Sequence, residues 1–399
     1  MAETRLIAAV FCAESYNALA VIRALGRNGV PVMAIGTDED SISFRSRYAT
    51  ECLRHPNPTD EDAFVAFAIE LSRRLAVEGR RAVAFPSSDR VIRLLSLHRD
   101  EIEGGLELYL PSRETVTDCL DKLAQYRLCE QIGVPFPRTY TNGSEAALLT
   151  DLADGRLLLP VIFKARTPLA SEALNRQFRR VLLSDRDQVE AQIKAAREHD
   201  VQYVVQEFLP GGDDQLYTLG ATMDRSGAML AHFTGRKLRQ MPPRFGICRV
   251  GETVSAPKIV EHGEKLLRAL GFCGIAQVEF KFDARDGQYK LMEVNPRSWS
   301  WIGLPMALGC DLAGAMFAAA TGQKPPPGPA ELEWGLWISL THDFDFSIGY
   351  RDGLPWTNLF QGHTRVVEAF MATDDPMPGL AHFARFGREL LGRVFHRLR

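Results

Sequence analysis

Residues 276–295 alternate between apolar and polar side chains in two runs that a turn separates. The two-residue period of a strand puts apolar residues of the first run on one face and polar residues on the other, Val278, Phe280 and Phe282 against Gln277, Glu279 and Lys281. Asp286 and Gly287 are a turn signal. A loop of residues 285–287, with Gly287 left-handed, keeps Met292 on the apolar face, whereas a two-residue loop does not. The pattern predicts an antiparallel hairpin.

This register places Glu279 directly opposite Glu293 and Gln277 opposite Asn295. Carboxylates across a ladder have Cβ atoms about 5 Å apart, and at an effective dielectric near 20 their repulsion is on the order of 3 kcal/mol. A cation or a shared proton has to offset it. Two carboxylates and an amide suit Mg²⁺, which favours oxygen ligands and substrate phosphates, and Arg297 is placed to meet the same phosphates. The alternative is a solvated strand face with both acids in water.

Residues 1–115 predict a small doubly wound α/β domain. Leu6 to Val10 form a continuous apolar run, as in a parallel strand buried on both faces, and a helix stopped by Gly29 and a second strand follow. A second such unit is expected between residues 62 and 103. Ligands favour the carboxyl ends of parallel strands, which here carry the loops 13–17 and 87–89.

Residues 116–322 predict an α+β domain built mainly on antiparallel sheet. A helix ends at Gly133, and short strands, helices and the hairpin follow up to an alanine-rich helix near Gly322. "KPPPGPAE" is a linker by composition. The remaining residues, 323–399, form a C-terminal extension that ends in a helical apolar pattern with arginines on the opposite face. This helix either packs on the protein body or makes peripheral contact with a membrane.

Composition excludes several classes of protein. A net charge of −3 gives no general argument for nucleic-acid binding, and 46% hydrophobic and 24% charged residues are typical of a globular protein. The seven cysteines contain no CxxC pair, so neither a zinc site nor a redox dithiol is expected. The first residues lack the pattern of a signal peptide, and no apolar run is long enough to cross a bilayer. We expect a cytoplasmic protein, and no oligomeric state is predicted.

Four motifs, in order along residues 1 to about 320, resemble the ATP-grasp superfamily. Glu293-x-Asn295-x-Arg297 is similar to its second metal-binding strand, and Glu279 matches the ligand on the earlier strand. "DKLAQYRLCEQIGVPFPRTY" resembles the opening helix with the first nucleotide lysine, Lys122, and "PVIFKAR" the strand with the second, Lys164. "VVQEFLPG" resembles the hinge whose backbone contacts adenine. The resemblance implies an α/β plus α+β fold, with a pre-ATP-grasp domain (1–115), an ATP-grasp domain (116–322) and the extension (323–399).

The resemblance also implies an activity, an ATP-dependent ligase that joins a carboxylate to an amine or other nucleophile through an acyl phosphate, closest to the D-aspartate ligase type. ATP and Mg²⁺, or Mn²⁺, would be the cofactors, and a small-molecule carboxylate and an amine the substrates. The implied metal ligands are Glu279, Glu293 and Asn295. The implied nucleotide-binding residues are Lys122, Lys164, Gln206, Glu207, Phe208, Leu209 and Asp214. The implied catalytic residues are Arg297 and Lys237, and the candidate substrate residues are Glu14, Ser15, Ser88, Asp89 and Arg236.

Several alternatives remain open in the sequence. The acid that accepts from the ribose is Glu207, Asp213 or Asp214. The segment after Lys164 lacks the glycines of many family members, so phosphate cover is expected from Arg176, Arg179 or Arg180. The basic segment 234–252 is either a solvated charged loop or an anion clamp. The same site would also serve a phosphotransferase or a regulatory protein that binds ATP without turnover. Trp334, Trp337 and Trp356 are expected in a core or an interface.

Overall fold

The computed structural model describes residues 5–102, 104–166, 174, 177–178, 180–243, 246–329, 331–350 and 360–397. Arg176 and Arg179 of the predicted phosphate cover, with Arg244 and Trp356, lie outside this part of the chain. The chain divides into two compact units. Unit 1 comprises Met1–Val134, Gly212–Phe280 and Glu293–Arg399, and unit 2 comprises Pro135–Gly211 and Lys281–Met292. The domain boundaries expected near residues 115 and 322 stay predictions.

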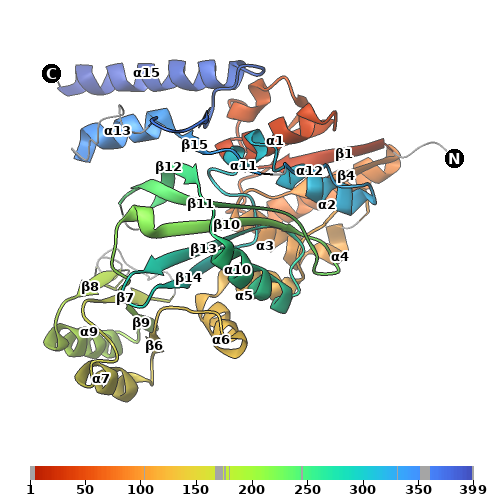
Figure 1. The fold of residues 1–399 in the computed structure, drawn as a ribbon. Coiled ribbons are helices and arrows are strands. Elements are labelled where there is room, and N and C mark those ends of the chain that lie inside the picture. Colours follow the sequence, from red (N-terminus) through yellow and green to blue (C-terminus); the bar gives the residue numbers. More distant parts are fainter. Residues whose placement is uncertain are drawn as a thin grey trace. The chain divides into compact units, whose positions relative to one another are not determined.

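Unit 1 begins with a five-stranded sheet in the order β3-β2-β1-β4-β5 (Figure 1), and all of its strand pairs are parallel. Its strands are β1 (Arg5–Phe11), β2 (Val32–Gly36), β3 (Ala49–Arg54), β4 (Arg80–Phe85) and β5 (Leu106–Glu107). Its helices are α1 (Tyr16–Arg27), η1 (Ile42–Arg45), α2 (Glu61–Val77), α3 (Asp89–Leu97), α4 (Arg99–Ile102), α5 (Arg113–Leu120) and α6 (Lys122–Ile132). This confirms the predicted α/β fold class, because the apolar runs of β1 and β2 are buried by neighbours on both faces.

A seven-stranded sheet follows in the order β14-β13-β10-β11-β12-β15-β16. Its strands are β10 (Leu216–Met223), β11 (Met229–Met241), β12 (Ile247–Thr253), β13 (Gly274–Asp283), β14 (Gln288–Asn295), β15 (Gly335–Ile338) and β16 (Arg365–Glu368). The associated helices are η2 (Asp213–Gln215), α10 (Pro257–Ala269), α11 (Gly303–Ala307), α12 (Leu312–Thr321), α13 (Leu340–Tyr350) and α15 (Met377–Arg397). β11 pairs with both β10 and β12 over most of its length, so the basic segment beyond residue 233 is strand rather than loop.

Two tryptophans that follow the acidic hairpin pack on glycines of this sheet. Trp299 and Trp301 are buried. A Cβ on Gly220 of β10 would lie 2.1 Å from the Trp299 ring, and a Cβ on Gly235 of β11 would lie 2.7 Å from the Trp301 ring. These contacts require glycine at both strand positions, and they hold the segment after Asn295 against the sheet.

The C-terminal extension is part of unit 1 rather than a loose tail. Asp343 of α13 accepts hydrogen bonds from the guanidinium groups of Arg239 and Arg249 at 2.8 and 2.7 Å. In α15 the His382 ring stacks on Phe370 with centroids 3.5 Å apart. α15 lies beside α13 (Figure 1), where Arg393 forms an ion pair with Asp345. The C-terminal amphipathic helix α15 therefore packs on the protein body, which is one of the two alternatives expected for it.

Of the two tryptophans expected in a core or an interface and described here, one is buried and one is exposed. Trp337 is buried as expected, but Trp334 is 49% exposed. Among the described helices, none combines the length and the apolar character needed to span a bilayer.

Unit 2 is a four-stranded antiparallel sheet in the order β6-β9-β7-β8, with helices packed on it (Figure 1). Its elements are β6 (Thr139–Thr141), α7 (Glu145–Ala153), β7 (Val161–Ala165), β8 (Val181–Leu183), α9 (Arg186–Glu198) and β9 (Tyr203–Glu207). Leu148 of α7 and Val189 of α9 share one core with Phe163 and Val205 of the sheet. The short strands and helices predicted for this part of the chain are confirmed.

Candidate active site

The two carboxylates of the hairpin are joined by a chain of side-chain amides on one face. Gln277 Nε2 donates to Glu279 Oε1 at 3.0 Å. Asn295 Nδ2 donates to Gln277 Oε1 at 3.2 Å and to Glu293 Oε1 at 3.3 Å. The structure thus brings the three predicted metal ligands together, and it adds Gln277. Gly287 is left-handed as predicted, with φ +70°, but the loop also includes Ala284.

Each carboxylate meets a lysine that arrives from a different element. Lys237 of β11 is buried, and its Nζ lies 2.6 Å from Glu279 Oε1. Lys122, the first residue of α6, places its Nζ 2.7 Å from Glu293 Oε2. Glu293 keeps a side chain 33% exposed, whereas Glu279 is buried. The acids and the lysines form one alternating cluster of charges.

The surroundings of the two acids shift their pKa values in opposite directions. Burial raises the pKa of Glu279, and the neighbouring Glu293 raises it further against the pull of Lys237. Burial also acts on Glu293, but Lys122 and Lys237 together hold its pKa at about 2. Burial lowers the pKa of Lys237, but the charge and hydrogen bond of Glu279, together with Cys248 and Glu293, outweigh it, so the lysine pKa is raised. The charged form of Glu293 is favoured and that of Glu279 is disfavoured, and a further cation would favour the charged form of Glu279.

Two contacts that the sequence did not predict hold Lys122 over the hairpin. The helix expected to run through residue 121 breaks there, because Asp121 caps α6 by accepting from the Leu123 amide at 2.9 Å. One turn later the buried Gln125 accepts from the Val294 amide at 2.9 Å and donates to the Cys119 carbonyl at 2.6 Å. Gln125 therefore ties the lysine's helix to the strand of Glu293. A glutamine on a helix face carries no signal of this role in the sequence.

Arg297 lies beside the ligand edge of the parallel sheet. Its guanidinium binds both oxygens of Asp89 at 2.7 and 3.0 Å. The next residue, Ser298, accepts from Asn17 Nδ2 at 3.1 Å and donates to Ser87 Oγ at 3.1 Å. The sequence placed Arg297 and Asp89 in different roles, and the structure pairs them. Asn17 belongs to the predicted loop 13–17, but its tie to Ser298 was not anticipated.

Two of the other candidate substrate residues cap helices, and a third is exposed. Ser15 and Ser88 cap α1 and α3, accepting from the Ala18 and Val91 amides at 3.3 Å. Their hydroxyls are therefore engaged in helix starts. Glu14 is exposed, and its closest donor is the Thr37 amide at 3.4 Å.

The basic segment supplies structural pairs as well as Lys237. Arg236 donates to the buried Glu252 at 2.6 Å, and Glu252 also lies 2.9 Å from His363 Nε2. Arg239 and Arg249 are bound to Asp343, as described above. Arg236, Arg239 and Arg249 therefore lie on strands rather than in a solvated loop, and the anion clamp stays a prediction.

In unit 2, Lys164 lies near the end of the interior strand β7, beside Gln206. Lys164 Nζ donates to Gln206 Oε1 at 3.1 Å, and Gln206 Nε2 donates to Thr139 Oγ1 at 3.0 Å. The buried Gln206 thus fixes the lysine at the end of β7. Two of the predicted nucleotide-binding residues are therefore neighbours, and their role stays a prediction.

The predicted hinge after Gln206 is more heavily engaged than expected. The Glu207 amide donates to the Arg138 carbonyl at 2.9 Å, so it is not available to an adenine edge. The Glu207 carboxylate lies 2.5 Å from Arg285 and 3.5 Å from Lys290. A ribose hydroxyl bound by this acid would have to compete with both cations.

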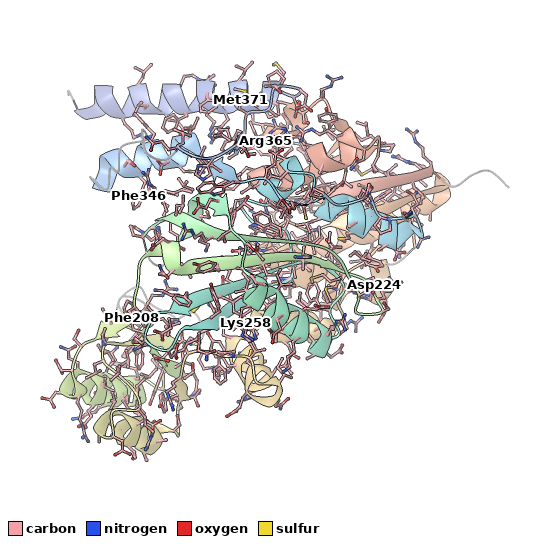
Figure 2. The ribbon with its side chains drawn as sticks, viewed as in Figure 1. Phe208, Asp224, Lys258, Phe346, Arg365 and Met371 are labelled. Atoms are coloured by element: carbon pink, nitrogen blue, oxygen red, sulfur yellow. The ribbon has the colours of Figure 1, made fainter. Side chains whose placement is uncertain are left out.

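Phe208 and Leu209, the next residues of the predicted hinge, both contact Lys281. Lys281 Nζ donates to the Leu209 carbonyl at 2.8 Å and lies 5.5 Å from the centre of the Phe208 ring (Figure 2). In unit 1, Asp213 accepts from the amide and the side chain of Gln240. Asp214 is exposed and accepts from Gln215 Nε2 at 3.3 Å. Of the three acids considered for the ribose, Asp214 is the least committed.

The donor set of the hairpin fits a hard divalent cation. Two carboxylates and an asparagine amide offer oxygen ligands, and two lysines already supply positive charge at the same place. Within the described residues, no group of three or more histidines, cysteines, aspartates or glutamates converges. The all-oxygen set, short of a complete cage, is what Mg²⁺ uses when it also binds phosphates and water.

Comparison with known proteins shows similarity of sequence and of fold. No model of a known protein family matches the sequence. D-aspartate ligase from Enterococcus faecium is 24% identical over 257 residues, which are 61% of this chain and 59% of that protein. The chain therefore spans less than two thirds of that relative's length.

Two solved structures show the same fold. N5-carboxyaminoimidazole synthetase from Staphylococcus aureus superposes with a TM-score of 0.63 and 15% identity, covering 88% of each chain. Biotin carboxylase from Campylobacter jejuni, solved as a β,γ-ATP complex, gives 0.61 at 17% identity and covers 84% of this chain and 74% of its own. These likenesses establish the fold.

Proposed function

The chain has the fold of the ATP-grasp enzymes, and from that premise we propose that it is an ATP-dependent ligase that joins a carboxylate to an amine. The single observation that carries the proposal is the pair Glu279 and Glu293, linked by amides and each matched with a lysine. The two acids lie on neighbouring strands, one buried and one partly exposed, and a divalent cation would offset the repulsion between them more directly than two separate lysines do.

The roles of the chain's residues follow from where their charges lie. Glu279, Glu293 and Asn295 would hold Mg²⁺, which when bound neutralises phosphate charge. Lys122 and Lys237, which offset the acids in this structure, would then be released toward phosphate oxygens. Lys164 is the lysine of unit 2 that we propose for nucleotide binding. Arg297 would leave Asp89 and steady the transferred phosphoryl group. The protein contributes position and charge rather than a covalent nucleophile.

The reaction balances in two steps. A carboxylate oxygen of the acid bonds to the γ-phosphorus of ATP while the bond from that phosphorus to the ADP oxygen breaks. The amine nitrogen then bonds to the acyl carbon, the bond from carbon to the phosphate oxygen breaks, and the amine loses a proton. The products are an amide, ADP and phosphate. We propose the cytoplasm as the compartment of this ATP-consuming activity.

An amino acid is the substrate class that we propose for the carboxylate. The similarity to D-aspartate ligase supports D-aspartate as the first acid to test. The experiment supplies ATP, Mg²⁺, acids labelled with ¹⁸O in the carboxylate and a panel of amines. A ligase would give amide and ADP in equal amounts and would move one ¹⁸O into phosphate.

The rival functions give different products in the same assay. A stable phosphorylated acid without amide would indicate a phosphotransferase. Tight ATP binding without ADP release would indicate a regulatory protein. Phosphate free of ¹⁸O, formed together with amide, would contradict the acyl phosphate.

A further inference from the structure

A groove of about 980 Å³ lies within unit 1, apart from the acidic hairpin. It is bounded by the turn after β1, the loop between β2 and η1, the first turns of α13, and α15. Its floor includes the aromatic rings of Tyr16, Phe370 and His382. Small-molecule sites are about 300–1,000 Å³ in volume, so this groove takes a ligand larger than one amino acid.

The two walls of the groove carry opposite charges. Glu14, Asp38 and Asp40 lie on the loops that follow β1 and β2, and Arg385, Arg388 and Arg393 lie on α15. The pKa of Arg385 is raised, chiefly because Glu389 accepts its hydrogen bond and further because Asp40 and Asp38 stand across the groove. A ligand that lies between the walls meets acids at one side and guanidinium groups at the other.

Not all of these charges are satisfied within the protein. Arg393 is paired with Asp345, Arg385 with Glu389, and Asp40 with Arg45. Glu14, Asp38 and Arg388 have no ion-pair partner within the residues that the structure describes. Two acids and one arginine thus remain for a ligand, on facing walls.

The acidic wall is linked to the active site through one short turn. Glu14, Ser15 and Tyr16 face the groove, and Asn17, the next residue, donates to Ser298 directly after Arg297. The acid-lined end of the groove is therefore the end that the turn after β1 connects to the metal strand. Carboxyl ends of parallel strands are also where ligands of such sheets bind.

We propose that this groove binds the amine substrate of the ligase, and that this substrate is a short peptide with a cationic amine and an anionic carboxylate at opposite ends. This inference rests on the proposed function and names its second substrate class. The amine lies toward Glu14 and Asp38, and the carboxylate lies along α15 at Arg388. The C-terminal extension thereby becomes part of substrate recognition.

Calorimetric titration of the full chain without ATP tests the groove directly. The probes are unblocked tripeptides Ala-Ala-X, with X as Ala, Lys, Glu or Phe, and their N-acetylated and C-amidated forms. At least one unblocked peptide binds, and blocking either end weakens it about fivefold, the most that a partly exposed ion pair contributes. If none of the four binds, or if blocked and unblocked forms bind alike, the proposal is overturned.

Two variants test which residue binds the amine end of the peptide and which binds its carboxylate end. Asp38→Asn weakens the free-amine peptide about fivefold but not its N-acetylated form, and Arg388→Gln does the same for the carboxylate. Asp62→Asn and Arg73→Gln, exposed on α2 outside the groove, serve as matched controls and leave affinity unchanged. Equal losses for the blocked and unblocked peptides would overturn the assignment of the ends.

A kinetic readout connects the groove to the reaction. In the ligation assay Asp38→Asn raises KM for the amine and leaves KM for ATP unchanged, and a change in KM for ATP alone would overturn the link.

Failure of the ligase proposal and failure of the groove proposal give different results. Peptide binding without amide formation would end the ligase and keep the groove, whereas amide formation without peptide binding would end the groove alone.

Discussion

At the scale of single residues, Glu293 and Glu279 differ because of the lysine each meets and the solvent each retains. Lys122 holds the pKa of the half-exposed Glu293 at about 2, whereas burial raises that of Glu279. The sequence predicted the shared face of the acids from alternation alone. It could not predict the partner of Glu293, because Lys122 is 171 residues away and long-range pairs leave no local pattern.

Lys164 is the residue whose loss tests the nucleotide side of the site. Its Nζ, now on Gln206, offers a charge to phosphates, so Lys164→Ala raises the Kd for ATP about tenfold, the worth of one charge-assisted contact. Fluorescence titration with a labelled ATP analogue measures it. Lys194→Ala, an exposed lysine of α9, is the matched control. An unaltered Kd for Lys164→Ala would remove this lysine from the site.

His382 makes stability depend on pH. Burial lowers its pKa to about 4, with smaller contributions from His342 and Arg385 that outweigh Glu389. Since the folded pKa is depressed below the ordinary 6.5, the neutral ring favours folding above pH 6.5, and this stability is lost as pH falls toward 4. The loss is at most about 3 kcal/mol.

Urea unfolding at several pH values measures this effect. The free energy of unfolding of the wild type falls more steeply between pH 6.5 and pH 4 than that of His382→Asn, which lacks the titrating ring. Parallel pH profiles for the two proteins would refute the assignment.

At the scale of elements, β11 is a strand that the local sequence pattern did not predict over its basic half. Its basic residues suggested a loop, but their neighbours decide otherwise. Lys237 is matched by Glu279 from β13, and Arg239 by Asp343 from α13. Charges that would disfavour a buried strand are acceptable once acids from distant elements meet them. Helices and strands with clear periodicity, such as α10 and the hairpin, could be predicted without knowing which distant residues they contact.

Asp343 anchors α13, and its loss is expected to be severe. The carboxylate is fully buried between two buried guanidinium groups, with Phe346 of the same helix (Figure 2) beneath Arg249. Asp343→Ala removes the buried carboxylate that both arginines share and lowers the free energy of unfolding by about 3–5 kcal/mol.

Denaturant unfolding with a matched variant checks the role of Asp343. Asp345→Ala, on the same helix, removes an exposed pair with Arg393 and costs at most about 1 kcal/mol. Similar losses for the two variants would show that Asp343 is not the anchor.

At the scale of the whole molecule, the order of motifs along the chain was the informative feature. It predicted the ATP-grasp fold that the solved structures match. The extension was unreadable because its short elements β15 and β16 gain stability only as further strands of a sheet begun elsewhere. Its ties, such as Arg23 to Asp375, join segments at the two ends of the chain.

Peripheral membrane contact through α15 remains a prediction of the whole chain. Leu380 and Leu391 stay 53% and 59% exposed on a helix that also carries arginines. Such a surface favours anionic bilayers. Full-length protein therefore co-sediments with vesicles of anionic lipid, and a chain ending at residue 379 does not. Equal amounts in the pellet, or none for the full chain, would end the membrane interpretation.

The central claim is that Glu279 and Glu293 share a divalent cation that arrives with ATP. Electron paramagnetic resonance of Mn²⁺, in place of Mg²⁺, with a non-hydrolysable ATP analogue tests it most directly. We expect the wild type and the control Glu70→Gln to bind the ion, while Glu279→Gln and Glu293→Gln each raise its Kd by about tenfold or more. Wild-type affinity for Mn²⁺ in both hairpin variants would contradict it.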